Sequence, residues 1–350
     1  MLRVGVIGAG NISRMHLDSF GKNVDAELVA VSDINEQLVK ERAEAYGVKT
    51  YYTDYKKIIE DESIDAVSIV TPTFTHHQII LEALAAGKHV LCEKPPCFTP
   101  EQAQECADAA EKAGKVLMYA FVCRFTNEMK YLKEYIDSGR MGEIYQAEAV
   151  SVGRCSMLRG WFVDKELAGG GVLLDAAIHR IDEAMYLMGY PKVKMVVGYS
   201  NNVNSDLPTK VKGIGEGWAS CDVNDYKRTV ESAAGGYVAL ENGACLFVKS
   251  GGVMYTVEQA GYIDLVGDKG GTRYTYGKAP KLVTNIDDYI YDMQPEISGN
   301  INPYNREVDH FIDCCINGTE CIAPGWQAVE VMKIIDGIYK SAETGKPVIY

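Results

Sequence analysis

The first third of the chain alternates between short apolar runs and segments with helical periodicity. Helical spacing of apolar residues predicts helices at 36–46, 75–86 and 100–113. Strands that alternate with helices pair in parallel, so residues 1–123 predict a doubly wound α/β sheet. The apolar, β-branched runs that predict its strands are residues 3–7, 27–32, 66–70, 90–92 and 116–121.

After residue 123 the pattern changes to a period of two, which is typical of strands with one buried face. Turn signals at 241–243 and 267–270 join neighbouring strands into hairpins. Residues 124–350 therefore predict an α+β domain with an open, mostly antiparallel sheet. A long amphipathic helix is predicted at 326–344, at the end of this domain. This helix either stays with the second domain or packs back on the first. The predicted strands are 144–152, 193–199, 236–240, 244–249 and 256–266.

The composition of the 350 residues restricts the class of protein. A net charge of −13 and a pI near 5.0 argue against binding to nucleic acid or to an anionic membrane. No apolar run approaches the length of a membrane span, and the Met1-Leu2-Arg3 start leads into a strand, so no signal peptide is expected. Ten cysteines without a CxxC motif indicate neither a zinc site nor a disulfide framework, and they favour a reducing cytoplasm.

A glycine-rich turn follows the first predicted strand and precedes a helical pattern, which is the setting of a dinucleotide fingerprint. Gly8 allows the tight turn, and Gly10 lets backbone amides approach a pyrophosphate at the helix N-terminus. Ser13 replaces the usual third glycine or alanine. Asp33 ends the second strand, where a carboxylate accepts both ribose hydroxyls of adenosine and repels a 2′-phosphate. These residues predict binding of NAD in preference to NADP.

Lys94 follows a short buried strand and precedes Pro95 and Pro96. Open α/β sheets bind ligands at this edge, and the prolines stiffen the backbone. A lysine held there is suited to hydrogen-bond a reacting oxygen. Thr71 and His76 are expected in a neighbouring strand-end loop, although His76 and His77 taken alone predict a solvated helix start.

A second group of chemically active residues follows the run Gly169-Gly170-Gly171. Asp175 and His179 lie one helical turn apart, so their side chains can touch. A carboxylate beside an imidazole fixes its tautomer and raises its basicity, as a general base near neutral pH requires. A helix-surface ion pair is the alternative. The glycines favour the catalytic interpretation, because they let a cofactor or substrate approach closely.

These segments together resemble the Gfo/Idh/MocA oxidoreductases, which include glucose-fructose oxidoreductase and inositol dehydrogenases. The resemblance implies an N-terminal Rossmann domain and a C-terminal domain on an open antiparallel sheet. It also implies that Lys94 contacts the reacting hydroxyl and that Asp175 and His179 form the acid–base pair. The matching residues are Gly8, Gly10, Asn11, Ile12, His16, Thr71, Pro72, His76, the run 86–95, Arg124, Phe125 and the stretch 169–182.

The resemblance assigns further residues to the two ligands. Asn11 and Ile12 join the glycines of the dinucleotide turn. Thr71, Pro72, His76 and Glu93 match positions that line the nicotinamide side, together with Lys94. The expected substrate contacts are Arg124, Arg159 and Trp161, besides Asp175 and His179.

The sequence thus predicts an NAD-dependent dehydrogenase acting on a secondary hydroxyl of a sugar, glycoside or inositol, with no metal. His179 takes the hydroxyl proton and Lys94 polarises the oxygen, although Lys94 is itself an alternative base. Two other functions stay open. A retained NAD can support redox-neutral cleavage or epimerisation, and a nucleotide-sensing protein needs no turnover.

The second sheet also predicts assembly. Too few helices follow Gly189 to cover both faces of this sheet, and an exposed apolar face is usually an interaction surface. We therefore expect a homodimer or homotetramer formed sheet to sheet. The apolar strand residues on which this expectation rests are Val238, Leu240, Leu246, Val248, Ile263 and Leu265.

Overall fold

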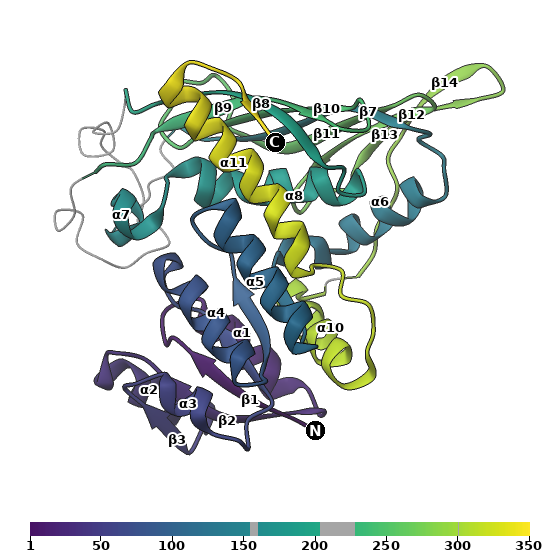
Figure 1. Ribbon diagram of the computed structural model, residues 1–350. Helices are drawn as coiled ribbons and strands as arrows, with labels where there is room; N and C mark the ends of the chain where they lie inside the picture. Colours follow the sequence, from purple (N-terminus) through teal and green to yellow (C-terminus); the bar gives the residue numbers. More distant parts are fainter. Residues whose placement is uncertain (155–159, 204–227, 300) are drawn as a thin grey trace. The chain divides into compact units, whose positions relative to one another are not determined.

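The computed structural model describes residues 1–154, 160–203, 228–299 and 301–350, which divide into two compact units (Figure 1). Unit 1 comprises Met1–Phe125 and Ile301–Val329. Unit 2 comprises Thr126–Asn300 and Glu330–Tyr350. The expected division placed everything after residue 123 in one domain, whereas the structure places Ile301–Val329 with the N-terminal unit.

Unit 1 is built on a six-stranded sheet with the strand order β3-β2-β1-β4-β5-β6, and every neighbouring pair is parallel. The doubly wound Rossmann sheet is therefore confirmed. Its strands are β1 (Leu2–Ile7), β2 (Ala26–Ser32), β3 (Thr50–Tyr52), β4 (Ala66–Ile69), β5 (His89–Glu93) and β6 (Leu117–Ala120). The connecting helices are α1 (Ser13–Lys22), α2 (Glu36–Tyr46), α3 (Lys56–Glu60), α4 (His76–Ala85) and α5 (Pro100–Ala113).

Local sequence explains where these helices begin and end. Asn35 caps α2 by accepting from the Leu38 amide at 3.0 Å, and Thr99 caps α5, which has Pro100 in its first turn. Gly47 and Gly114 end the same helices in the left-handed conformation. Between helices and sheet, one apolar core is formed by Val6, Ala9, Leu17, Val31, Val39, Ala43, Val48 and Val70.

Helix α10 (Pro303–Asn317), which the sequence pattern did not predict, belongs to unit 1 because it packs on α1. Phe20 and Phe311 meet edge to face, with their ring centroids 6.4 Å apart. Beside them, Ser19 Oγ donates to Asn305 Oδ1 at 2.9 Å. The contact joins segments nearly 300 residues apart, so no local periodicity reports it.

Unit 2 carries a nine-stranded sheet with the order β14-β13-β12-β11-β7-β10-β9-β8-β15. All neighbouring pairs are antiparallel except β7 and β10, which are parallel, so the mostly antiparallel sheet is confirmed. The turns at 241–243 and 267–270 connect hairpins as expected. The strands are β7 (Ile144–Val152), β8 (Val193–Asn201), β9 (Ala233–Leu240), β10 (Cys245–Gly251), β11 (Ala260–Gly267), β12 (Gly270–Thr275), β13 (Lys281–Ile286), β14 (Tyr289–Met293) and β15 (Val348–Ile349).

One face of this sheet is covered by helices of the described chain. In Figure 1, α6 (Asn127–Asp137), α8 (Ile178–Leu187) and the unit 2 part of α11 (Gly325–Thr344) lie on the same side of the sheet, and no described helix lies on the other. The short helix α7 spans Lys165–Ala168. From Glu330 onward α11 packs on β8, where Ser341 Oγ accepts from the Gly198 amide at 2.9 Å. The first turn of α11 belongs to unit 1. Within the described ranges, no helix combines the length and apolarity that crossing a membrane requires.

Candidate functional site

The glycine turn after β1 has the geometry that a dinucleotide fingerprint requires. Gly8 has φ near +110°, and a Cβ built there would lie 2.7 Å from the Val70 carbonyl oxygen, so only glycine fits. Gly10 differs, because a Cβ built there meets nothing within 4 Å. The space beside Gly10 is what a pyrophosphate needs in order to approach the backbone. The turn therefore fits the NAD that the sequence predicts.

Helix α1 begins directly beside this space. Ile12 is its N-cap residue, and no side chain caps the helix there. Asn11 lies in the turn, and its carbonyl accepts from the Arg14 amide at 3.3 Å. An N-terminus without a side-chain cap presents backbone N–H groups and the positive end of the helix dipole, which suits a phosphate.

Asp33, at the end of β2, is tied to the glycine turn. Its Oδ2 accepts from the Ala9 amide at 2.8 Å and its Oδ1 from the Asn35 amide at 2.9 Å. Each carboxylate oxygen keeps a further lone pair for a ribose hydroxyl. The buried Arg42 donates through Nε and Nη2 to the Ala9 carbonyl. That guanidinium braces the turn, so Arg42 already has a structural use that competes with binding a 2′-phosphate.

Lys94 lies at the C-terminal end of β5 on a turn that a buried network holds in place. The Lys94 amide donates to Glu93 Oε2 at 3.0 Å, and Glu93 Oε1 lies 3.1 Å from His16 Nε2. Because a carboxylate only accepts, Nε2 carries the proton in this pair, and Nδ1 lies 2.9 Å from Ser68 Oγ. His16 and Ser68 are fully buried. Residues of α1, β4 and β5 thereby fix the backbone that carries Lys94.

His76 is buried, which corrects the expectation of a solvated helix start. Its Nδ1 lies 2.8 Å from the Pro95 carbonyl and its Nε2 2.9 Å from the Thr71 carbonyl. Burial lowers the pKa of His76, so the neutral ring donates to one of these two carbonyls at a time. His76 thus connects the loop after β4 with the turn after Lys94. Thr71 and Pro72 are half-buried in that loop, and Pro72 accepts from Thr75 Oγ1 at 2.8 Å.

Arg124, Arg159 and Trp161 are the substrate contacts expected outside the helical segment of Asp175 and His179. Arg124 is 2% exposed, and its Nη1 donates to the Ile322 carbonyl and to Gln327 Oε1 of α11. These contacts favour a structural role for Arg124 over contact with the substrate. Trp161 is half-buried in a short 3₁₀ turn, where it stacks on Phe162 with centroids 3.9 Å apart. Arg159 lies outside the described residues.

The glycine run before the acid–base pair is packed against protein, which corrects the expectation that it admits a ligand. A Cβ built on Gly170 would lie 2.4 Å from the Tyr339 hydroxyl, and one on Gly171 would lie 2.6 Å from the Glu231 carbonyl oxygen. Glu231 Oε2 accepts from the Gly171 amide at 2.8 Å, and Oε1 accepts from the Leu173 amide at 3.0 Å and from Tyr339 Oη at 2.9 Å. Burial raises the pKa of Glu231 despite these bonds. Sequence analysis missed Glu231 and Tyr339, because no local pattern links them to Gly171.

Asp175 and His179 lie on one continuous helical segment, but its first turn is π-helical at Leu173–Ala177 and continues as α8. π-turns occur frequently at functional sites. The two side chains are half-buried, whereas Asp182 one turn further on is fully buried and accepts from Tyr190 Oη at 2.5 Å. The segment therefore presents Asp175 and His179 at its surface and uses Asp182 for structure. Its start is clamped by Glu231.

A cavity of about 500 Å³ lies at the opposite edge of the Rossmann sheet, near the N-terminal ends of its strands. Leu2, Lys88, His89 and Cys315 are among its lining residues. Ligands of open α/β sheets bind at the carboxyl ends of the strands, so this cavity is not part of the cofactor site.

Comparisons with known proteins agree with this geometry. Residues 2–121 match the oxidoreductase family with an NAD-binding Rossmann fold, and residues 133–349 match the C-terminal alpha/beta domain of that family. D-Glucoside 3-dehydrogenase of Escherichia coli K12 is 36% identical over 348 residues, which cover 98% of this chain and 96% of the relative. Inositol 2-dehydrogenase of Rhizobium meliloti 1021 is 26% identical over 345 residues, which cover 97% of this chain and 96% of the relative.

Solved structures of other proteins share the fold of this chain. Levoglucosan dehydrogenase in complex with NADH and levoglucosan matches with a TM-score of 0.85 at 23% identity, covering 99% of both chains. The two family models together match most of the chain, and the D-glucoside 3-dehydrogenase matches it almost end to end. The chain is a member of the Gfo/Idh/MocA family of NAD-binding oxidoreductases.

Proposed function

We propose that this chain is an NAD-dependent dehydrogenase that oxidises a secondary hydroxyl of a glucoside, with the hydroxyl at carbon 3 as the first candidate. The observation that carries the proposal is the rigidly held Lys94 turn, in a chain 36% identical to a D-glucoside 3-dehydrogenase along nearly its whole length. Binding of a nucleotide alone requires no lysine at the end of β5 and no acid–base pair on α8. These residues therefore favour an enzyme over a sensor.

The residues have separate roles in the proposed reaction. Lys94 Nζ donates a hydrogen bond to the substrate hydroxyl oxygen, and its positive charge stabilises the developing alkoxide. His179 accepts the hydroxyl proton, and Asp175 orients the imidazole and favours its protonated form. NAD⁺, when bound, supplies the hydride acceptor. Residues Gly8, Gly10, Asn11, Ile12 and Asp33 hold its pyrophosphate and adenosine, and Thr71, Pro72 and Glu93 belong to its nicotinamide side.

Substrate class and net reaction are tested together. The purified chain is mixed with excess NAD⁺ and with methyl glucoside, free glucose or myo-inositol, while nicotinamide absorbance and products are followed. We expect one NADH per keto-glucoside formed. Turnover of a glucoside without accumulation of NADH would instead establish redox-neutral chemistry with a retained cofactor. Tight NAD binding without any product from the panel would favour the sensor.

The identity of the base is tested by pH profiles measured where chemistry limits the rate. If His179 is the base, His179→Ala removes the low-pH limb, because protonation of the imidazole no longer blocks catalysis. Asp175→Asn keeps a limb at lower pH, since the anion that favours imidazolium is gone. An unchanged limb in His179→Ala transfers the base role to Lys94.

We propose action in a reducing compartment such as the cytoplasm, because ten cysteines without a CxxC motif are typical of a protein whose thiols stay reduced.

A further inference from the structure

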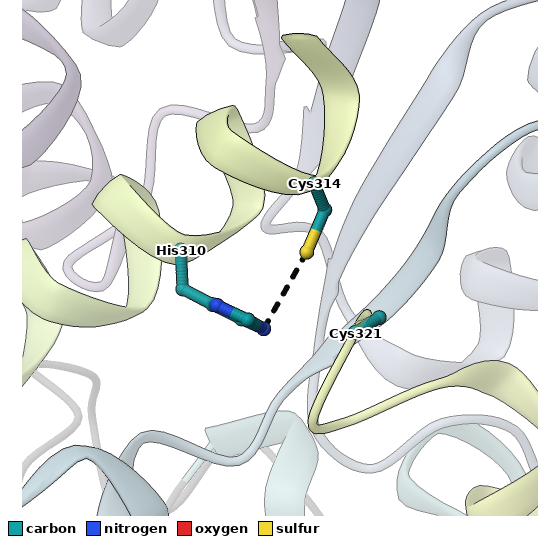
Figure 2. Close-up of side chains that lie close together, drawn as sticks. All are labelled: His310, Cys314 and Cys321. Carbon is teal, nitrogen blue, oxygen red and sulfur yellow. Dashed lines mark hydrogen bonds between the residues drawn. The ribbon is translucent and has the colours of Figure 1, made fainter. Parts of the chain in front are cut away.

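A cluster of three metal-ligating side chains lies in unit 1, apart from the residues assigned to cofactor and substrate. His310 and Cys314 come from α10, and Cys321 comes from the loop that follows it (Figure 2). One ligand atom from each lies within 4.8 Å of the other two. Cys314 is buried, and the other two are half-buried. Two sulfurs and one imidazole are a donor set that Zn²⁺ prefers.

The backbone explains how the three side chains meet. His310 and Cys314 are four residues apart on α10, so they share one face of the helix. Gly318 ends the helix in the left-handed conformation and lets the chain turn back. The returning loop is bonded to β6, because the Ala323 carbonyl accepts from the Tyr119 amide at 3.1 Å. Arg124 donates to the Ile322 carbonyl beside it. The loop that presents Cys321 is thus held in position by strand contacts.

The imidazole nitrogen of the cluster is in the form that binds a metal. His310 Nε2 accepts from the Ile322 amide at 3.0 Å, so this nitrogen is the unprotonated one. Cys314 Sγ lies 3.4 Å from the same nitrogen. The imidazole nitrogen and the two sulfurs therefore lie close enough together to share one metal ion.

We propose that His310, Cys314 and Cys321 bind one Zn²⁺ per chain, which ties the end of α10 to the loop at 318–324. Tetrahedral zinc with the usual bond lengths of ~2.1 Å to nitrogen and ~2.3 Å to sulfur separates its ligand atoms by about 3.5 Å. The Nε2–Sγ distance of 3.4 Å already meets this value. A small movement of Cys321 completes the site, and water takes the fourth position. The Ile322 amide loses its acceptor on Nε2, so one hydrogen bond is exchanged for three metal–ligand bonds.

This site is distinct from the dehydrogenase chemistry, which needs no metal. No CxxC motif marks this site in the sequence. The spacing here is His-x₃-Cys-x₆-Cys, with two ligands from a helix face and one from a loop. The expected role is structural, because the ligands join α10 to the segment that bonds to β6.

The test uses the full chain, stripped with a chelator and kept in a phosphine reductant. Zn²⁺ is titrated in competition with a chromophoric chelator, and Co²⁺ is titrated separately to record its spectrum. We expect one equivalent of either metal, with a thiolate charge-transfer band and tetrahedral absorption for Co²⁺. Cys321→Ser and Cys314→Ser should weaken zinc binding by at least roughly 10- to 100-fold, the effect usual for lost metal partners. Cys315→Ser, next to Cys314 but outside the cluster, is the matched control and should bind as the parent does.

Thermal unfolding provides a second readout that does not depend on activity. Zinc should raise the melting temperature of the parent and of Cys315→Ser, because a ligand that binds the folded state stabilises it. The same zinc concentration should leave Cys321→Ser unshifted. A parent that takes up less than one equivalent overturns the proposal, whether or not the variants fold. Equal affinity of the parent and Cys321→Ser also overturns it.

Discussion

At the scale of single residues, the structure separates Lys94 from the groups that support it. Glu93 and His16 are buried and bonded to each other and to the backbone of the turn, whereas Lys94 is half-buried at the strand end. This largely buried carboxylate–imidazole pair next to the lysine holds the turn. The lysine is therefore the residue of this turn that we expect to contact substrate.

Replacing Lys94 tests this assignment. Lys94→Met keeps the length of the side chain and removes its charge, so NAD binding and the free energy of unfolding should be unchanged. Turnover should fall by roughly 10²- to 10⁴-fold, the range for losing a positioned acid–base group. Steady-state kinetics and calorimetric titration with NAD measure the two effects. Lys49→Met, at an exposed position, is the control, and equal turnover of the two variants would assign Lys94 to structure alone.

At the scale of elements, the glycine turn requires Gly8 and Gly10 for different physical reasons. Gly8→Ala forces a side chain into left-handed backbone against the Val70 carbonyl, so it should lower the melting temperature of the apoprotein. Gly10→Ala places its methyl in open space and should leave the apoprotein as stable as the parent. Its dissociation constant for NAD should rise at least about tenfold, which is about 1.4 kcal/mol. Unchanged NAD affinity in Gly10→Ala would contradict the pyrophosphate assignment.

A second prediction at this scale concerns the clamp formed by Glu231 and Tyr339 on the start of the π-turn. Burial raises the folded pKa of Glu231 above its ordinary value of 4.5, so the folded protein holds this proton to higher pH than the unfolded chain does. The contribution of this group to stability is therefore full at low pH and is lost as pH rises through the folded pKa.

Glu231→Gln removes this titration and places an amide NH₂ against a backbone N–H donor. We expect about 1–3 kcal/mol lower unfolding free energy at pH 7 and a shallower decline between pH 4.5 and neutrality. The turnover number should fall while NAD affinity stays unchanged, because the clamp positions the segment of Asp175 and His179. Urea unfolding over a pH series measures the first effect. Tyr145→Phe, at an exposed tyrosine, is the control, and a parallel pH dependence of parent and Glu231→Gln would contradict the clamp.

At the scale of the whole molecule, the uncovered face of the nine-stranded sheet bears on assembly. The apolar strand residues on which the expectation of assembly rested are buried; they include Val238, Leu246, Ile263 and Leu265. The exposed apolar residues of the strands include Val197 and Tyr199 of β8 and Phe247 of β10, which are 41%, 46% and 42% exposed. We still expect a homodimer or homotetramer, with Val197, Tyr199 and Phe247 in the contact surface between subunits.

Light scattering tests the assembly. The parent should have the mass of a closed dimer or tetramer at micromolar concentration. Phe247→Asp places a charge on the exposed face and should shift the mass toward the monomer without unfolding the sheet. Val24→Asp changes an exposed apolar residue in unit 1 and should leave the mass unchanged. A monomeric parent would show that the face has another use.

Local patterns were sufficient for much of this architecture. β7 was predicted with its observed bounds, Ile144–Val152, because a long period-two run reports which face is buried. The cofactor turn was predicted as well, since a strand, a glycine turn and a helix are contiguous. The strands β13 and β14 and the helices α6 and α10 were missed. Both helices are amphipathic and have local start signals, because Thr126 caps α6 and Asn302 precedes Pro303 at the start of α10, so these two helices were within reach of the sequence pattern.

What the sequence determined by itself is therefore the chemistry that contiguous residues carry: a glycine turn beside an acid at the end of β2, a lysine between a strand and two prolines, and an acid and a histidine one turn apart. The tertiary structure decided which side chains serve those groups. It buried His76 and Arg124 against backbone carbonyls, packed Glu231 against Gly171, and brought Cys321 to His310. The physical reason is that a buried polar group must find a partner, and the partner's position depends on the fold and not on neighbours in the chain.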